Sequence, residues 1–173
     1  MKTKLLIASL FAILVTSSVN AQWLQQGSPT GNPLYGVFFV DANYGAACGI
    51  SGTIIRTTNG GVDWSVQNSG TGANLFGICF VDANTGIVVG DGRISRTTDG
   101  GANWINIPPP AAEYLKGVTF TDANTGFIAG SNGSIFRTTN AGANWAALSP
   151  GTSEVLLKVS FANANTGFVV GLN

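Results

Sequence analysis

Residues 80–104 read FVDANTGIVVGDGRISRTTDGGANW, and this stretch decides the fold because its pattern returns along the chain. The run FVDANTG at Phe80 recurs as FVDANYG at Phe39, FTDANTG at Phe120 and FANANTG at Phe161. Tryptophans separated by 41, 40 and 41 residues stand at Trp23, Trp64, Trp104 and Trp145. The shorter interval reflects a turn that reads GDG at Gly90, where the other units have GISG or GSNG. Such a repeat predicts one structural unit copied along the chain.

Each unit holds four short segments that are typical of β-strands. In the second unit they are Gly77–Val81, Gly86–Val89, Arg93–Thr97 and Trp104–Ile107. Glycine, asparagine or aspartate bounds each one, as expected for strands joined by tight turns. Four strands in about 40 residues predict an all-β fold, a β-propeller of four-stranded antiparallel blades. One blade cannot bury both of its faces, so neighbouring blades must stack and share a core.

The turn between the third and fourth strands follows the pattern Thr-x-Asn/Asp-x-Gly-x-x-Trp. An Asn or Asp side chain can cap backbone N–H groups in such a turn, and the glycine permits a positive φ. The tryptophan then buries a large ring against the blade. The pattern occupies Thr57, Asn59, Gly61 and Trp64; Thr97, Asp99, Gly101 and Trp104; and Thr138, Asn140, Gly142 and Trp145.

This turn resembles the Asp-box of bacterial neuraminidase-type (BNR) repeats. The wider unit, F-x-D-A-N-x-G followed by I-x-R-T-T-D/N-G-G-x-x-W, resembles the photosystem II assembly and stability factor family over residues 23–173. The resemblance implies a seven-bladed propeller among exported, non-enzymatic proteins that act as assembly or docking factors. A fold-level resemblance carries architecture better than it carries biology.

The first 21 residues are interpreted as a signal peptide rather than as part of the fold. Lys2 and Lys4 precede an apolar run, Leu5–Val15, that is too short to span a bilayer. Small residues end at Ala21, which predicts cleavage after Ala21 and a mature chain that starts at Gln22. The protein is therefore expected to be secreted or periplasmic, with a membrane anchor as the alternative reading.

Residues 22–173 are interpreted as a partial propeller whose units span about 23–63, 64–103, 104–144 and 145–173. Seven blades of this size would need roughly 290 residues, and the mature chain supplies about 3.7 blades. We therefore expect an incomplete arc from a truncated chain, with two apolar blade faces exposed. If the chain ends at Asn173, pairing with another copy is expected.

Composition narrows the function. The chain has no histidine, which excludes Ser-His-Asp and Cys-His nucleophile activation and histidine metal sites. Eight basic residues balance eight acidic ones, so no basic footprint for nucleic acid is expected. Neither a cofactor nor a metal is predicted. These features favour a secreted, non-enzymatic scaffold that binds a protein partner or assists assembly.

A fragment of a sialidase or glycoside-hydrolase propeller is the alternative. Hydrolysis of a glycosidic bond needs two carboxylates at a defined separation. Asp41, Asp82 and Asp122 occupy repeat positions, as structural residues do, and the non-repeated acids have no paired context: Asp63, Asp91, Glu113 and Glu154. A structural module of a larger surface array is a third possibility.

The loops that join consecutive blades and the turns between the second and third strands differ from unit to unit, whereas the turns after the first and third strands are nearly constant. A partner is expected to be specified by what varies, so the binding face is placed on these loops. The candidate residues are Pro108, Pro109, Pro110, Glu113 and Tyr114. The alternative is that the loops vary without selection.

Arg56, Arg96 and Arg137 hold the same position in three units. The functional interpretation is an arginine patch that docks an anion or a partner. The structural interpretation, which is favoured, is an ion pair within each blade with Asp41, Asp82 or Asp122, although the arginine would have to lean across the middle strand.

Cys48 and Cys79 are the two cysteines of the chain, and they lie at non-equivalent positions of adjacent units. Export would permit a disulfide between them. Two buried free thiols are the favoured interpretation, because the repeat does not bring the two positions together by symmetry.

Overall fold

The computed structural model describes residues 25–172, and the residues before and after them, including the predicted signal peptide at 1–21, lie outside the described part. The described chain forms short strands and one single-turn 3₁₀ helix, η1 (Ile50–Gly52). Blade 1 contains β1 (Leu34–Phe39), β2 (Gly45–Gly49), β3 (Ile54–Thr57) and β4 (Ser65–Gln67). Blade 2 contains β5 (Leu75–Phe80), β6 (Gly86–Gly90), β7 (Arg93–Thr97) and β8 (Ile105–Ile107).

Blade 3 contains β9 (Leu115–Phe120), β10 (Gly126–Gly130), β11 (Ile135–Thr138) and β12 (Ala146–Leu148), and blade 4 contains β13 (Leu156–Asn163) and β14 (Thr166–Gly171). Each of the first three blades is a four-stranded antiparallel sheet in sequence order, and blade 4 is a two-stranded pair. The predicted all-β blade architecture is thereby confirmed. In blade 2, the first strand starts two residues before the predicted Gly77, and the last strand starts after Trp104.

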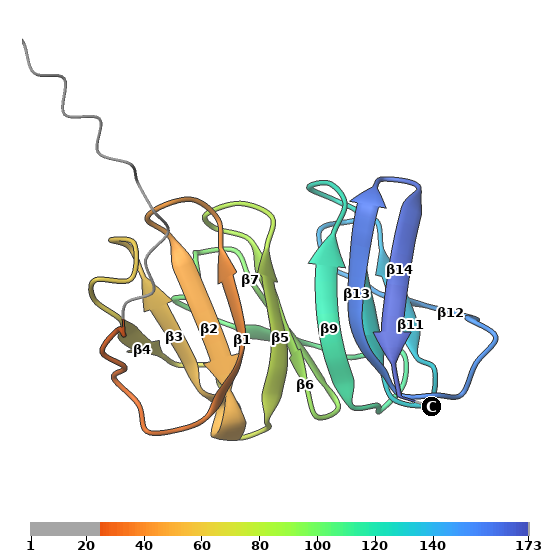
Figure 1. The fold of residues 1–173 in the computed structure, drawn as a ribbon, viewed down its shortest axis with the longest axis horizontal. Helices are drawn as coiled ribbons and strands as arrows, with labels where there is room; N and C mark the ends of the chain where they lie inside the picture. Colours follow the sequence, from red (N-terminus) through yellow and green to blue (C-terminus); the bar gives the residue numbers. More distant parts are fainter. Residues whose placement is uncertain (1–24, 173) are drawn as a thin grey trace, which may run out of the picture.

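The blades stand side by side, with the first strand of each on the inner side of the arc. Figure 1 looks onto this inner side, where β1, β5, β9 and β13 follow one another across the molecule. Contacts between consecutive inner strands join blade 1 to blade 2, blade 2 to blade 3 and blade 3 to blade 4. The inner strands therefore form one continuous curved wall.

The hydrophobic core lies between blades, not within them. One cluster joins blade 1 to blade 2 and contains Ala46, Cys48, Ile54, Leu75, Ile78, Phe80, Val88 and Trp104. A second cluster joins blade 2 to blade 3, and a third joins blade 3 to blade 4. Blades 2 and 3 thus each bury one face against the preceding blade and one against the following blade, as a stacked repeat requires.

A glycine in each of the first three inner strands lets the blades approach closely. A Cβ atom at Gly77 would lie 3.2 Å from the Lys116 carbonyl oxygen and 3.4 Å from the Gly117 Cα. A Cβ at Gly36 would meet blade 2 in the same way, and one at Gly117 would meet blade 4. The fourth inner strand has Lys158 at this position.

Both cysteines are buried as free thiols, which confirms the favoured interpretation. Burial raises the pKa of Cys48 to about 12 and that of Cys79 to about 11, so both remain protonated at neutral pH. They act as small apolar residues of the core.

Candidate functional site

The repeated turns lie together at one end of the blades. The backbone N–H of Gly60 donates to the Asn43 carbonyl (2.9 Å), and equivalent bonds join Gly100 to Asn84 and Ala141 to Asn124. The turn after the first strand and the Asp-box turn are therefore tied together in every complete blade. Because the turns have the same hydrogen bonds in all three four-stranded blades, we assign them a structural role.

Each Asp-box is held by its threonine and its Asn or Asp. In blade 2, Thr97 Oγ1 donates to Asp99 Oδ1 (2.8 Å) and accepts from the Gly101 N–H (2.9 Å). Asp99 Oδ1 also accepts the Asn103 N–H (2.9 Å), while its Oδ2 accepts the Asn103 side-chain amide (2.8 Å). These bonds favour the charged carboxylate and lower the pKa of Asp99 to about 2, with the Asn103 side chain as the largest cause.

Two of the three repeated arginines, Arg56 and Arg96, reach the next blade. Arg96 Nε donates to the Ala141 carbonyl in the Asp-box of blade 3 (2.8 Å), and the Arg56 guanidinium lies against Gly100 in the Asp-box of blade 2. Arg137 is exposed, with its guanidinium 5.9 Å from the Phe127 ring centroid.

The hypothesis of an ion pair within each blade is wrong. Asp82 Oδ1 accepts the backbone N–H groups of Asn84 and Thr85, both at 2.7 Å, and Asp41 and Asp122 hold the same kind of turn. These backbone bonds lower the pKa of Asp41 and Asp122. The physical reason is the width of the blade, since the arginine side chain reaches a neighbouring blade more easily than across its own middle strand.

The loop predicted to bind a partner lies at the opposite end of the blades. Glu113 accepts hydrogen bonds from Ser131 Oγ (2.9 Å) and the Asn132 side chain (2.8 Å), so its carboxylate fixes the turn of blade 3. Pro108 and Pro110 are exposed, Pro109 is half-buried, and Tyr114 is an exposed ring beside the inner strands. Of these residues, Tyr114 alone lies near a second set of residues that differ from blade to blade, because its ring is close to Lys116.

That further group arises from a β-bulge near the start of every inner strand. The pairing of β5 with β6 passes from Leu75↔Gly90 to Gly77↔Val89, so Phe76 is the extra, unpaired residue. The other three inner strands shift register at the same place. A bulge re-aims the side chain that it carries, and bulges are common beside functional sites. We name the four bulged residues and the adjoining tyrosine the bulge cluster: Tyr35, Phe76, Lys116, Leu157 and Tyr114.

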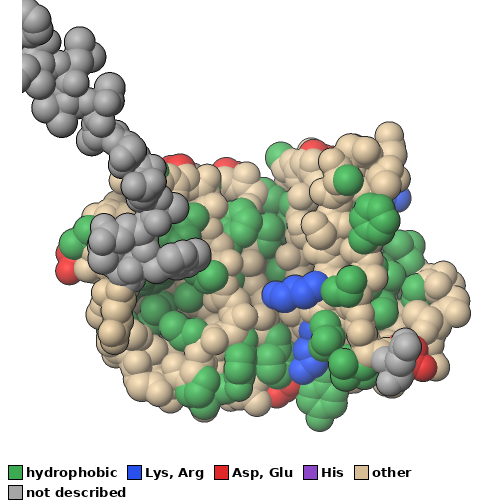
Figure 2. All heavy atoms as spheres, in the orientation of Figure 1, with side chains coloured by type: hydrophobic (Ala, Val, Ile, Leu, Met, Phe, Trp, Pro, Cys, Tyr) green, Lys and Arg blue, Asp and Glu red, His purple; other side chains and the backbone are tan. Residues whose placement is uncertain are grey.

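The bulge cluster combines aromatic rings with a cation. Lys116 Nζ lies 3.5 Å from the Phe76 ring centroid and 5.5 Å from that of Tyr114. The rings of Tyr35 and Phe76 are 5.5 Å apart and tilted by 35°. Figure 2 shows basic side chains at the centre of this inner face, with hydrophobic side chains beside them. Such a surface can take an anionic group next to an apolar or aromatic one.

Sequence reasoning overlooked the bulge cluster, although the repeat contains a signal for it. The residue before each bulge is always leucine, and a phenylalanine always follows four residues after the bulge, at Phe39, Phe80, Phe120 and Phe161. The bulged residue changes from tyrosine to phenylalanine, lysine and leucine. The residue three positions later also varies, from Phe38 to Cys79, Thr119 and Ser160. Variation between a constant leucine and a constant phenylalanine is the same kind of signal as the variation that placed binding on the loops.

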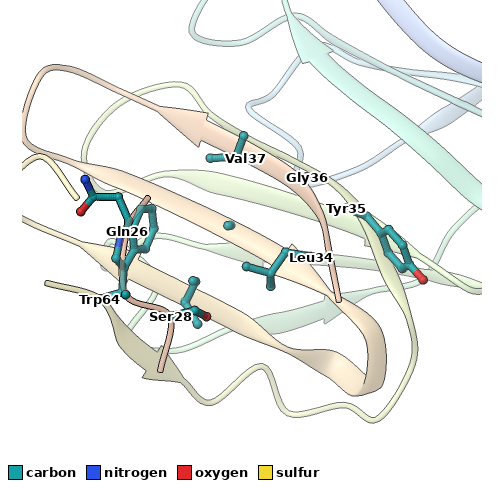
Figure 3. Close-up of a pocket in the computed structure, with 10 residues that line it drawn as sticks. Gln26, Ser28, Leu34, Tyr35, Gly36, Val37 and Trp64 are labelled. Carbon is teal, nitrogen blue, oxygen red and sulfur yellow. The ribbon is translucent and has the colours of Figure 1, made fainter. Parts of the chain in front are cut away.

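The face of blade 1 that points away from blade 2 carries a cavity of about 330 Å³. Leu34 and Val37 from β1 and Trp64, just before β4, line it, and Gln26 and Ser28 approach from the segment before β1 (Figure 3). Ala47 and Ile55 also line it. The cavity is mainly apolar and offers no group suited to catalysis.

Among residues 25–172, no three His, Cys, Asp or Glu side chains are grouped so that they could hold a metal ion. No helix in that part of the chain is long and apolar enough to cross a membrane.

Comparison with known proteins places the fold. The family model for photosynthesis system II assembly factor YCF48 matches residues 15–152. The structure of YCF48 bound to D1 peptide is 24% identical, with a TM-score of 0.70 over 86% of this chain and 49% of that chain. YCF48 from Cyanidioschyzon merolae is also 24% identical, with a TM-score of 0.71 over 87% of this chain and 54% of that chain.

A glycoside hydrolase of the GH74 type from Niastella koreensis is 14% identical, with a TM-score of 0.63 over 80% of this chain and 26% of that chain. At these identities the solved structures establish the fold alone. The chain spans about half the length of the two YCF48 structures. A search of curated proteins gave no match to the sequence.

Proposed function

Because this chain belongs to the photosystem II assembly factor YCF48 family, we propose that it is a non-enzymatic scaffold that binds a segment of a partner protein on its bulge cluster. The observation that carries the proposal is the Lys116 ammonium lying over the Phe76 ring beside Tyr114. The repeat aims this position at the inner face in every blade, but fills it with a different residue each time.

The chemistry of the bulge cluster defines the segment. The lysine favours a carboxylate, and the flanking rings favour an apolar or aromatic side chain next to it. Aromatic residues of this kind dominate the energetics of protein interfaces. A family relative has been solved with a peptide, D1, bound to it. An extended peptide segment with an acidic group is thus the ligand that we assign to this chain.

An experiment can separate this site from the rest of the surface. Short synthetic peptides that carry an aromatic residue beside a free carboxylate are titrated against the protein by fluorescence anisotropy. Lys116→Ala and Phe76→Ala should each weaken binding by about tenfold. Val62→Ala, a matched control on an exposed side chain of the Asp-box turn, should leave it unchanged. Equal affinity for all four proteins would contradict the proposal.

A fragment of a glycoside hydrolase is the second candidate, and the fold shared with GH74 enzymes is the observation in its favour. Its chemistry needs a free carboxylate pair. Here Asp91 accepts the Asn74 side chain (2.9 Å), while Glu113 is committed to the turn of blade 3. Turnover of fluorogenic glycosides that disappears in Asp91→Asn or Glu113→Gln would favour the enzyme over the scaffold.

We further propose that the scaffold is exported to the periplasm or the medium. The support is the charged start, the short apolar run and the small residues that end at Ala21. N-terminal sequencing of protein from the native host should begin at Gln22. An intact Met1 on cell-associated protein would contradict export by cleavage.

A further inference from the structure

A second hollow lies on the inner wall, at the opposite end of the inner strands from the bulge cluster. It has a volume of about 280 Å³, and residues of three consecutive blades line it, among them Phe38 of blade 1, Cys79 of blade 2, and Thr119, Phe120 and Asp122 of blade 3. We name it the wall pocket. We propose that the partner segment bound at the bulge cluster continues along the inner wall and places a basic side chain in the wall pocket. This inference rests on the proposed function and adds a second recognition site to it.

One short side chain opens the wall pocket. The position three residues after the bulge holds Phe38 in blade 1, and its ring packs against the core between blades 1 and 2. The same position of blade 2 holds Cys79, whose thiol lies beside the backbone of Phe120 in blade 3. A cysteine is too short to fill the space that a phenylalanine fills. The hollow therefore follows from a difference between two blades of the repeat.

The charge of the wall pocket suits a cation. The exposed carboxylate of Asp122 lines it, and its Oδ1 accepts the backbone N–H groups of Asn124 and Thr125, both at 2.8 Å. These bonds, with that from Asn124 as the largest cause, lower the pKa of Asp122, so the carboxylate is charged at neutral pH. No lysine or arginine is among the described residues that line the pocket. A basic group of the partner can therefore pair with this carboxylate.

The aromatic rings of the wall pocket favour a side chain over a simple cation. Phe38 and Phe120 both line the pocket and are half-buried, so part of each ring is accessible. A guanidinium group can stack on an aromatic ring and bond a carboxylate at the same time, and an ammonium group can also lie over a ring. A volume of about 280 Å³ is at the small end for a ligand site, which suits one side chain.

The two sites lie within reach of one extended segment. Lys116 of the bulge cluster and Thr119 of the wall pocket both belong to β9, three residues apart. A strand rises about 3.3 Å per residue, so the two positions are separated by about 10 Å. An extended peptide covers that distance in about three residues, and the side chain of Asp122 lies further on. The partner segment should therefore carry its carboxylate and its basic residue about three to five positions apart.

The test compares two peptides that differ in the charge of one residue. Both carry an aromatic residue beside a carboxylate, and about four positions away one has arginine and the other has citrulline, its neutral isostere. Each peptide is made with the arginine or citrulline before and after the carboxylate, because an extended segment can run either way along the wall. In fluorescence anisotropy, wild type should bind the arginine peptide about threefold more tightly than the citrulline peptide in one of the two orders.

Asp122→Asn should abolish this preference. The repeat itself has asparagine at this position of blade 4, where Asn163 Oδ1 accepts the Asn165 N–H (2.9 Å), so the variant retains the turn and loses the charge. Asp82→Asn is the matched control, because Asp82 holds the equivalent turn of blade 2 and does not line the wall pocket. This control should keep the preference for arginine.

Cys79→Phe closes the wall pocket with the residue that blade 1 has, and should bring the arginine peptide to the affinity of the citrulline peptide. If this larger residue perturbs folding, as thermal unfolding would show, Asp122→Asn alone decides. Equal affinity of wild type for the two peptides in both orders, or a preference that survives Asp122→Asn, would overturn the wall pocket. The bulge cluster would stand in that case if Lys116→Ala still weakened both peptides. Peptides that bind wild type and Lys116→Ala equally would instead contradict the proposed function.

Discussion

Blade 1 and blade 2 present the same face of the repeat to opposite surroundings. Val37, on the face of blade 1 that points away from blade 2, is 65% exposed, whereas Ile78 at the same position of blade 2 is 6% exposed. The local structure of the two strands is the same, including the bulge and the register. The difference teaches that burial in this protein is supplied by the neighbouring blade and not by the unit itself.

The largest difference between the two blades is expected when the buried residue Ile78 is shortened. Ile78→Ala removes buried methyl and methylene groups at the contact between blades 1 and 2, and should lower the free energy of unfolding by about 2–4 kcal/mol. Val37→Ala, its matched control, should change it by less than about 0.5 kcal/mol. Chemical denaturation of both variants measures the difference, and similar losses would show that the two faces are equally buried in solution.

Adding a single methyl group tests the close approach of the inner strands. Gly77→Ala places a Cβ 3.1 Å from Val89 Cγ2 and 3.2 Å from the Lys116 carbonyl oxygen. We expect a loss of about 1–2 kcal/mol in the free energy of unfolding from this overpacking. Gly72→Ala, where an added Cβ has nothing within 4 Å, is the control that should be nearly neutral. Equal effects in denaturation would argue that the blades are further apart in solution.

The repeated arginines allow the same comparison of a residue that contacts the next blade with one that is exposed. Arg96→Ala removes the hydrogen bond to the Ala141 carbonyl and should cost about 1 kcal/mol of stability. Arg137→Ala removes an exposed side chain and should cost less than about 0.5 kcal/mol. Thermal unfolding measures both. A loss of partner binding in Arg96→Ala with unchanged stability would favour the arginine patch instead.

The smallest effect at neutral pH is expected at the Asp-box of blade 2. Folding lowers the pKa of Asp99 from 3.8 to about 2, so its carboxylate stabilises the fold above about pH 4 and loses that contribution as the pH falls towards 2. Asp99→Asn, the residue found at Asn59 and Asn140, should leave stability near neutral pH almost unchanged. It should also reduce the loss on acidification to about pH 3, as thermal unfolding at the two pH values would show. If wild type and Asp99→Asn lost the same stability between neutral pH and about pH 3, the Asp99 carboxylate would not have the stabilising role assigned to it.

The sequence was enough to predict the blades because their determinants are local and repeated. Residues a few positions apart determine the Asp-box turn and the strand lengths. They also determine that the Asp-box turn and the turn after the first strand lie at the same end of the blade. The partner of Arg96 could not be predicted in this way. It depends on the distance between blades, which no repeat pattern contains.

The candidate site was predicted only in part. Tyr114 lies in the bulge cluster, but Glu113 holds a turn and the prolines lie outside the cluster. The bulge at Phe76 adds one residue to a strand, and strict alternation along the sequence does not reveal it. Its side chain therefore does not lie on the sheet face that regular alternation of side chains would predict for it.

Site-specific photo-crosslinking in the native host tests the central claim most directly, because it reports contact with the natural partner. A photoreactive amino acid replaces Phe76 in the bulge cluster or Val62 in the Asp-box turn, and the two proteins are irradiated in the cell. A scaffold that binds on its inner strands should give a discrete adduct from position 76 and none from position 62. Adducts from position 62 alone, or none from position 76, would contradict the account.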